Sequence, residues 1–213
     1  MEIKTFTFSP IEVNSYLLWD ETKEAVLIDC GCFGKEEEKK LSNFIEKNGL
    51  ILKHYLNTHL HFDHIFGNPF IMKKFGISAE ASDGDWHWAE NIAQRVARFG
   101  IIYDQKIPAL ARVLKHNDEV TFGNGCTIKA IAVPGHSPGS LAYYLRSENM
   151  LFSGDALFQG SIGRTDFADA DFDTLITSIK EKLFTLPDET VVYPGHAGTT
   201  TIGFEKQYNR FLK

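Results

Sequence analysis

The run His59-Leu60-His61-Phe62-Asp63-His64 places three imidazoles and one carboxylate within six residues. The apolar stretch 51–57 precedes it, which predicts a buried strand that leads directly into the polar cluster. Burying these groups without partners would be costly, whereas a cation such as zinc binds neutral imidazole and carboxylate oxygen readily. The fold must therefore bring more of the chain to this point to complete a metal site.

Three more candidate ligands, His136, Asp155 and His196, follow in turn-like segments that contain glycine. Each comes just after a predicted strand, where loops on a rigid scaffold often carry function, although an Asp in such a place can also be a helix cap. Seven ligands suit two ions that share a hydroxide and keep a position open for water. We interpret the remaining histidines as packed or surface residues: His54, His87 and His116.

The hydrophobic pattern predicts strands that alternate with helices along the chain. We expect strands at residues 3–8, 14–19, 25–28, 51–57, 77–79, 119–122, 127–133, 141–145, 150–152 and 190–193. We expect helices at 35–47, 65–75, 172–184 and 204–212, so that Asp63 and His64 open the second helix. Strand-rich halves with helices between them fit a four-layer α/β (α+β) sandwich, and 213 residues without a linker fit one domain over 1–213.

The segment 83–115 is rich in aromatic residues and allows two interpretations. It reads as helical from about 85 to 98, with one apolar face made by Trp86, Ala89, Ala93, Val96 and Ala97. This face could pack in the core or form a homodimer contact. Alternatively, the segment could be a hydrophobic lid over the metals.

Charge and cysteine content exclude several classes of function. The net charge of −6, from 22 basic and 28 acidic residues, and the lack of a basic run argue against nucleic-acid binding. The three cysteines are sparse, and no apolar run begins the chain, so we expect a reduced, cytoplasmic setting. No stretch is long enough to span a membrane.

The seven candidate ligands, in this order, resemble the pattern of the metallo-β-lactamase superfamily, and more closely its glyoxalase II-like hydrolase branch. The resemblance extends to residues 28–31, 134–139, 154–158 and 160–166, and so covers nearly the whole chain. It implies the αββα sandwich fold of that superfamily.

The resemblance also implies two divalent metal ions, with zinc first and iron or manganese as alternatives. By this comparison His59, His61 and His136 hold the first ion, Asp155 bridges, and the second ion takes the remaining set: Asp63, His64 and His196. An Asp at the bridging place, rather than Cys, is the hydrolase and thioesterase pattern and argues against a zinc β-lactamase of the Cys-containing type.

The implied reaction is attack of a metal-bridging hydroxide on the carbonyl of a small thioester or ester, with Asp63 as the catalytic residue that orients and deprotonates the metal-bound water. Arg164 lies where glutathione-thioester hydrolases carry a basic residue that contacts the substrate carboxylate, but it could equally pair with Asp166. Only Ala197–Lys213 follows the last ligand, and Ala197-Gly198-Thr199 replaces the Glu-Tyr-Thr of those enzymes. We therefore expect another thiol carrier or a small ester.

Two other functions remain open at this point. Persulfide dioxygenases share the fold and a Gly-Arg-Thr-Asp stretch like 163–166, but hold one iron through two His and one Asp, here His59, His136 and Asp155. Iron accepts these ligands as readily as zinc does. The second alternative is a non-catalytic, metal-bound interaction protein.

Overall fold

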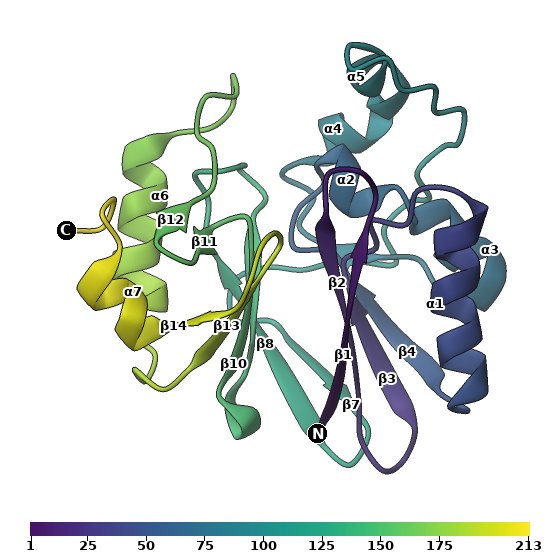
Figure 1. Cartoon of the computed structure of the whole chain (residues 1–213), viewed down its shortest axis with the longest axis horizontal. Coiled ribbons are helices and arrows are strands. Elements are labelled where there is room, and N and C mark those ends of the chain that lie inside the picture. Colours follow the sequence, from purple (N-terminus) through teal and green to yellow (C-terminus); the bar gives the residue numbers. More distant parts are fainter.

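The computed structural model describes residues 1–213, and two facing β-sheets with helices on their outer sides form its centre (Figure 1). The first sheet is mixed: β3–β6 run parallel, and β1 and β2 add to it as antiparallel strands. Its six strands, in spatial order, are β1 (Glu2–Phe8), β2 (Val13–Trp19), β3 (Glu24–Ile28), β4 (Ile51–Leu56), β5 (Glu80–Ala81) and β6 (Arg112–Val113).

The second sheet also has six strands and is mostly antiparallel, with β10 and β13 as its one parallel pair. In spatial order its strands are β14 (Thr200–Thr201), β13 (Val191–Pro194), β10 (Met150–Gly154), β9 (Leu141–Leu145), β8 (Cys126–Ala132) and β7 (Glu119–Phe122). A separate small hairpin pairs β11 (Leu157–Phe158) with β12 (Ser161–Ile162).

The helices form the two outer layers and a cap at one end. They are α1 (Lys35–Lys47), α2 (Phe62–Ile65), α3 (Asn68–Phe75), α4 (Trp86–Glu90), α5 (Ile92–Ala97), α6 (Phe172–Ser178) and α7 (Ile202–Tyr208), with a 3-10 turn η1 (Arg146–Glu148) and a π turn η2 (Ile179–Leu183). Helices α1 and α3 cover the first sheet, α6 and α7 cover the second, and α4 and α5 rise above one end of the sandwich (Figure 1). The predicted four-layer fold is confirmed.

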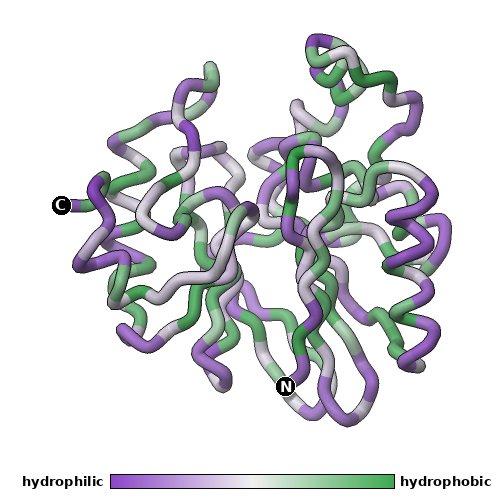
Figure 2. Tube along the Cα trace, in the orientation of Figure 1, coloured by the Kyte–Doolittle hydropathy of each residue, from purple (hydrophilic) through white to green (hydrophobic).

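Strand β3 shows how the sequence produces these layers. Because successive side chains of a strand point to opposite faces, Ala25 and Leu27 pack with Leu41 and Ile45 of α1. The alternate residues Val26 and Ile28 face the second sheet and join a separate core with residues of β8, β9 and β10. A third core lies between the second sheet and α6. Along the trace, hydrophobic residues concentrate in the strands, and hydrophilic ones on the outer turns of α1 (Figure 2).

The expected helix 65–75 is wrong in its boundaries, because the chain forms two helices with a break at Gly67. The backbone N–H of Gly67 donates to Cys30 O, and a Cβ here would collide with the Cys30 side chain. Pro69 lies in the first turn of α3, where its missing N–H costs nothing. Asp63 and His64 therefore lie within the short helix α2, not ahead of a longer one.

The expected helix 85–98 is also interrupted, at Asn91. The side-chain amide of Asn91 donates to His87 O and so competes with the backbone for hydrogen bonds. Of the residues expected to face inward, Ala89 and Val96 are buried, whereas Ala93 and Ala97 are exposed and Ile92 is buried instead.

Three further elements differ in their ends. The expected strand 77–79 is replaced by the two-residue β5, which begins directly after its expected end. The expected helix 172–184 changes to a π turn after Ser178, with the N–H of Phe184 donating to Ile179 O. Helix α7 begins and ends earlier than expected, because the Thr201 side chain accepts from Phe204 N at its start and Asn209 leaves helical geometry at its end.

None of the helices combines the length and the apolar character needed to cross a membrane.

Candidate metal centre

All seven predicted ligands lie together at one end of the sandwich, on loops and on α2. The first group comes from the segment after β4: His59, His61, Asp63 and His64. The second group comes from the other half of the chain, after β8, β10 and β13 respectively: His136, Asp155 and His196. The site therefore forms where the two sheets meet, and each half supplies part of it.

The ligand atoms fall into three overlapping groups, and the members of each lie within 4.8 Å of one another. The groups are His59, His61 and His136; Asp63, His64 and His196; and His59, His64 and Asp155. Two triads with a carboxylate between them have the spacing that a pair of ions needs.

Asp155 occupies the central position. Its Oδ1 lies 3.3 Å from His64 Nε2, and its Oδ2 lies 3.7 Å from His136 Nε2 and 3.6 Å from His196 Nε2. The carboxylate thus touches residues of both triads. A carboxylate in this position could bind one cation through each of its two oxygens.

Unpartnered buried atoms test whether a cation fits here. Four such atoms have no hydrogen-bond partner: His59 Nε2, His61 Nε2, His64 Nε2 and Asp155 Oδ1. Buried polar groups are nearly always hydrogen-bonded, so this concentration at one point needs an explanation. Divalent cations provide it, since imidazole nitrogen and carboxylate oxygen are their ordinary ligands. The residues present fit divalent metal binding.

The histidines of the cluster differ in pKa according to the groups that surround them. Burial, together with neighbouring imidazoles, lowers the pKa of His59 well below its usual value and that of His61 to about 3. Burial would also lower the pKa of His64, but Asp155, Asp29 and Asp63 outweigh it and raise that pKa. His59 and His61 are therefore neutral imidazoles that can bind a cation directly, whereas His64 must release a proton before its Nε2 can bind one.

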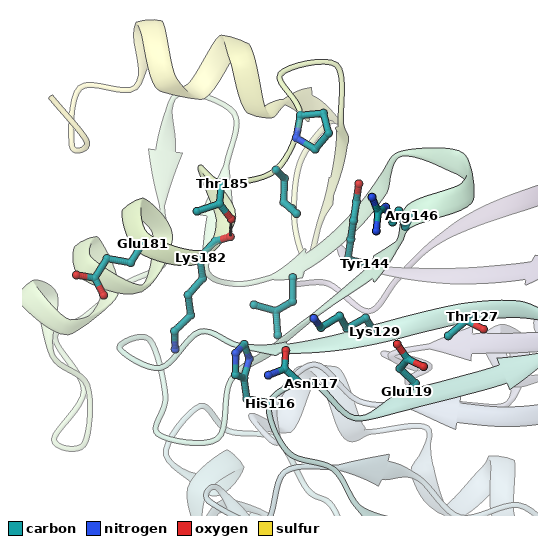
Figure 3. Close-up of a pocket in the computed structure, with 13 residues that line it drawn as sticks. His116, Asn117, Glu119, Thr127, Lys129, Tyr144, Arg146, Glu181, Lys182 and Thr185 are labelled. Atoms are coloured by element: carbon teal, nitrogen blue, oxygen red, sulfur yellow. Dashed lines mark hydrogen bonds between the residues drawn. The ribbon is translucent and has the colours of Figure 1, made fainter.

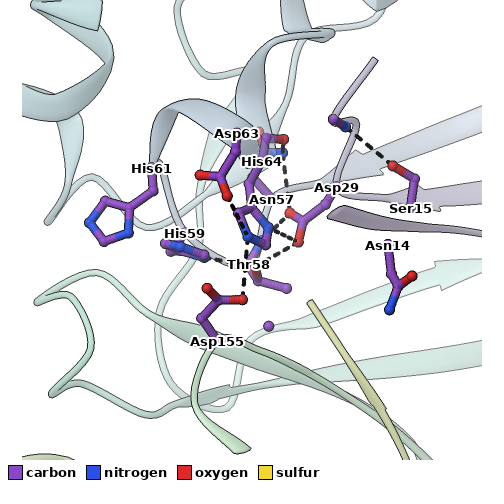
Figure 4. Close-up of polar contacts among 12 residues, drawn as sticks. Asn14, Ser15, Asp29, Asn57, Thr58, His59, His61, Asp63, His64 and Asp155 are labelled. Carbon is purple, nitrogen blue, oxygen red and sulfur yellow. Dashed lines mark hydrogen bonds and ion pairs between the residues drawn. The ribbon is translucent and has the colours of Figure 1, made fainter. Parts of the chain in front are cut away.

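Asp29 holds His64 from behind, although the sequence assigned it no role. Its Oδ2 accepts from His64 Nδ1 at 2.8 Å and from Thr58 Oγ1 at 2.7 Å, and its Oδ1 accepts from Thr58 N at 2.8 Å (Figure 4). Asp29 itself has a φ of 54°, a left-handed conformation that Asp tolerates better than most residues. Because a carboxylate only accepts hydrogen bonds, it leaves His64 Nε2 directed at Asp155.

Glycine permits the close approach of the loops that carry the last two ligands. A Cβ on Gly195 would collide with Asp155 Oδ1 and lie 2.7 Å from His64 Cε1. Gly154 has a φ of 51°, and a Cβ there would lie 2.6 Å from Thr58 Oγ1. Both positions must lack a side chain for the two halves of the site to meet.

A cavity of about 540 Å³ opens onto the cluster and is mainly apolar. Five of its lining residues are candidate ligands: His61, Asp63, His136, Asp155 and His196. The others are Ile11, Phe62, Trp88, Phe99, Ile101, Phe158, Arg164 and Phe167. A small organic molecule of ordinary ligand size fits this volume.

Arg164 pairs with Asp166, which is one of the two roles left open by the sequence. Its Nε lies 2.9 Å from Asp166 Oδ1 and its Nη2 lies 2.8 Å from Oδ2, with the side chain 71% exposed. The fork that would grip a substrate carboxylate is occupied in this geometry. Contact between Arg164 and a substrate remains a prediction.

The segment 83–115 combines both interpretations that the sequence allowed. Ala89, Ile92 and Val96 pack into a local core with Leu60, which lies within the His-rich run, and with Ile65, which directly follows it. Three residues of the same segment line the cavity: Trp88, Phe99 and Ile101. The segment thus contributes part of the apolar wall of the cavity, whereas a lid over the metals and a dimer contact stay predictions.

Sequence reasoning missed a second buried carboxylate, Asp85. It accepts hydrogen bonds from Ser137 Oγ and Gly139 N, both at 2.7 Å, and from Leu60 N at 3.4 Å. It therefore ties the start of α4 to the loops of His136 and of His59. Only its place at the expected start of a helix marked it in the sequence, and that signal indicates a cap.

A larger hollow of about 710 Å³ lies on the outer face of β8 and β9 and is mostly polar (Figure 3). Two of its side chains bond to the backbone of Ala132: the Nδ1 of His116 accepts from its N–H, and Lys182 Nζ donates to its carbonyl. Lys129 stands opposite Glu119 in the strand register. These side chains lie on β7 and β8 or contact the last residue of β8, and none belongs to the metal cluster.

Comparison with known proteins identifies the family. The sequence pattern of the Metallo-beta-lactamase superfamily matches residues 9–196. The chain belongs to this superfamily. The hydroxyacylglutathione hydrolase GloC of Haemophilus influenzae is 36% identical over 100% of this chain and 98% of its own length. The mitochondrial persulfide dioxygenase ETHE1 of Bos taurus is 32% identical over 85% of this chain and 63% of its own length.

Solved structures of the superfamily show the same fold. The BLEG-1 B3 metallo-beta-lactamase has a TM-score of 0.90 at 36% identity and covers 99% of both chains. TTHA1623 in a di-iron-bound form has a TM-score of 0.87 at 34% identity, covering 98% of this chain and 100% of its own. ETHE1 from Myxococcus xanthus has a TM-score of 0.80 at 31% identity, covering 99% and 84%. The predicted family and fold are confirmed, whereas the role of each ligand and the identity of the metal remain predictions.

Proposed function

We propose that this protein is a two-metal hydrolase that cleaves thioesters or esters of small molecules. One observation carries the proposal: Asp155 lies between two complete ligand triads at the floor of an apolar cavity. We assign His59, His61 and His136 to one ion and Asp63, His64 and His196 to the other. When bound here, divalent ions would lower the pKa of a water to roughly 7 and polarise a carbonyl oxygen.

Asp63 is the residue that handles the proton in this proposal. Burial acts to raise its pKa, but His64 and His196 outweigh burial and lower it, so the carboxylate is ionised. Its Oδ2 lies 3.4 Å from His196 Nε2 and the residue lines the cavity. An ionised carboxylate at this point can accept the hydrogen bond of an attacking water and take its proton.

Thioesters suit the site better than amides. A thiolate leaves readily, so its departure needs no acid from the protein, and no free acid other than the metal-binding groups lines the cavity. The similarity to GloC, named as a hydroxyacylglutathione hydrolase, supports this class of substrate. We propose zinc as the metal, and the di-iron-bound relative makes iron the first alternative.

Oxidation of a persulfide is the second candidate function. Two relatives named ETHE1, one of them a persulfide dioxygenase, support it. That reaction would use one iron on His59, His136 and Asp155. It would leave four of the seven candidate ligands without a metal to bind: His61, Asp63, His64 and His196.

Turnover measurements on protein loaded with zinc or with iron separate these functions. We expect release of thiol from lactoyl and acetyl thioesters of glutathione, without consumption of oxygen. Oxygen uptake with glutathione persulfide, at a rate above thioester cleavage, would favour the dioxygenase. A β-lactam in the same panel tests the activity named for the BLEG-1 relative. An intact metal site without any turnover would favour the interaction protein.

A further inference from the structure

The cavity above the metal cluster is unusual in having almost no polar group besides the candidate ligands. Seven of its thirteen lining residues are apolar. Ile11 and Phe158 lie on the side of His196, whose Nδ1 donates to Ile11 O and whose ring lies 6.2 Å from that of Phe158. Trp88 and Phe167 lie on the side of His61. A bound molecule would meet apolar surface on both sides of the cluster.

The one cation at the cavity does not alter this character. Arg164 already meets Asp166 through two hydrogen bonds, and its guanidinium lies over the ring of Phe167 at 4.9 Å. The pair carries no net charge. Asp166 occupies the Nε and Nη2 edge of the guanidinium, so a carboxylate on the substrate could use only the outer edge that includes Nη1 and would share the charge with Asp166.

Two aromatic rings form a roof beside the first triad. The Trp88 ring lies 4.6 Å from that of His61, and the Phe167 ring lies 5.0 Å from His61 and 5.6 Å from His136. Trp88 comes from α4, whereas Phe167 comes from the loop before α6. The roof thus joins segments that rise from opposite halves of the sandwich (Figure 1).

Asp169 fixes this roof. Its Oδ2 accepts from Trp88 Nε1 at 2.6 Å and lies 2.9 Å from His87 Nε2, so a carboxylate on the loop of Phe167 holds α4. On its other face Trp88 stacks with the Arg95 guanidinium at 3.5 Å. The indole is therefore held in one orientation by a hydrogen bond and by stacking.

From these contacts we infer that the site selects thioesters whose acyl group is uncharged and apolar, such as an aryl or branched aliphatic acyl group. Trp88 and Phe167 are then specificity residues, and Asp169 is the positioning residue that holds Trp88. This inference rests on the proposed thioesterase function and narrows it. Hydroxyacyl and dicarboxyl groups would lose hydration on entry and find few partners.

The expected preference follows from burial of apolar surface. Each methylene that enters the cavity should improve kcat/KM by about a factor of four, and a phenyl ring by more. Longer groups can continue outward, because Phe99 at the rim is exposed and Ile102 just beyond it is 92% exposed. Hydrophobic residues along this tip of the molecule are visible in Figure 2.

A matched panel of glutathione thioesters tests the inference on the metal-loaded enzyme. We expect kcat/KM for the phenylacetyl and isovaleryl thioesters to exceed that for the lactoyl and succinyl thioesters by at least about tenfold. Equal values, or a preference for lactoyl, would overturn the inference and leave the thioesterase function standing. Absence of hydrolysis with every member, and with the same acyl groups carried on N-acetylcysteamine, would overturn the thioesterase function and the inference with it.

Variants of the roof locate the selectivity. Trp88→Ala and Phe167→Ala should each reduce the phenylacetyl preference by about tenfold, mainly through KM. Phe204→Ala is the matched control, because Phe204 is a half-exposed aromatic on α7 outside the cavity. Retention of the full preference in both roof variants would overturn the assignment.

Asp169 needs a readout that separates positioning from stability. Asp169→Ala should raise KM for phenylacetyl glutathione about three- to tenfold while KM for the lactoyl thioester changes little, and Asp169→Asn, which keeps an acceptor for Trp88, should restore much of the loss. Asp188→Asn is its control, since Asp188 pairs with Lys206 on the surface. Equal rises in KM for both substrates would show a merely structural role.

Binding gives a readout that does not depend on turnover. Calorimetry with S-(2-phenylethyl)glutathione and S-(2-carboxyethyl)glutathione, which are stable thioethers, should show the phenyl compound binding at least about tenfold tighter, and Trp88→Ala should remove most of that difference. Equal affinities of the two thioethers for the unaltered protein would overturn the inference.

Discussion

Asp29 Oδ2 and His64 Nδ1 are 2.8 Å apart, and both residues are buried. The carboxylate therefore decides which nitrogen of the imidazole faces the metal cluster. Outer partners of this kind raise the basicity of a ligand and hold its ring in place. Two further hydrogen bonds, from Thr58 N and Thr58 Oγ1, hold the carboxylate itself.

Asp29→Asn should weaken metal binding about 10- to 100-fold, because the amide presents a donor where His64 Nδ1 also donates. Titration of the apo-protein with zinc against a competing chelator measures the change. Asp188→Asn, the surface variant, should bind as the unaltered protein does. An unchanged zinc affinity in Asp29→Asn would show that His64 needs no such support.

Purified protein loaded with zinc should carry close to two ions per chain, since both triads are complete. Replacing His64 and His196 together by Ala should leave about one. Elemental analysis after removal of free metal gives the count. One ion in the unaltered protein, and still one in the double variant, would contradict the two-metal assignment.

Removal of metal should lower the thermal stability. At a free ion concentration a hundredfold above the dissociation constant, one site stabilises the folded state by about 2.7 kcal/mol. For a chain of this size that corresponds to roughly 5–10 °C in Tm. Calorimetric scans with a chelator and after zinc is restored measure it, and the His64/His196 double variant should show a smaller shift. Identical Tm values with and without chelator would mean that the cluster binds no ion tightly.

Asp63→Asn should lower the rate of thioester hydrolysis by about two to four decades, because the amide cannot take a proton from water. Steady-state kinetics at saturating zinc, with metal content measured on the same sample, separate this effect from loss of the ion. Near-normal turnover at full metal occupancy would show that another group handles the proton.

Asp85→Ala should destabilise the fold by about 2–4 kcal/mol, because the buried donors Ser137 Oγ and Gly139 N would lose their acceptor. Urea unfolding measures the change, with Asp83→Ala as control, since Asp83 is exposed and only its backbone oxygen is bonded. A cost below about 0.5 kcal/mol would indicate that a neighbouring hydroxyl, such as that of Ser140, replaces the carboxylate.

The fold and the ligand cluster could be predicted because their signals are local and periodic. The continuous apolar run at residues 25–28 is typical of a strand that is buried on both faces, and the residues from His59 to His64 indicate a metal site within six positions. The breaks at Gly67 and Asn91 were missed for a different reason. Each depends on a contact with another residue, Cys30 O in the first case and His87 O in the second, which periodicity does not record.

The supporting residues of the site were the least predictable part. Asp29, Asp85 and Asp169 are single carboxylates in unremarkable sequence, and their roles follow from partners 29 to 81 residues away. Arg164 allowed two interpretations because its guanidinium can pair in the same way with the carboxylate of its sequence neighbour Asp166 or with a carboxylate on a substrate. Metal identity, one-domain organisation, dimer formation and cytoplasmic location remain predictions.

The ligands come from both halves of the chain, and this division determines when during synthesis the metal site can be complete. A ribosome releases residues 59–64 long before His196, which lies near the end of the chain. Until β13 has docked beside β10, the emerging polypeptide can offer only part of the donor set, and a captured ion would still be open to exchange. Tight binding of both ions therefore requires that β13 has docked beside β10, so the metal content of a preparation reports how many of its molecules have brought the two halves of the site together.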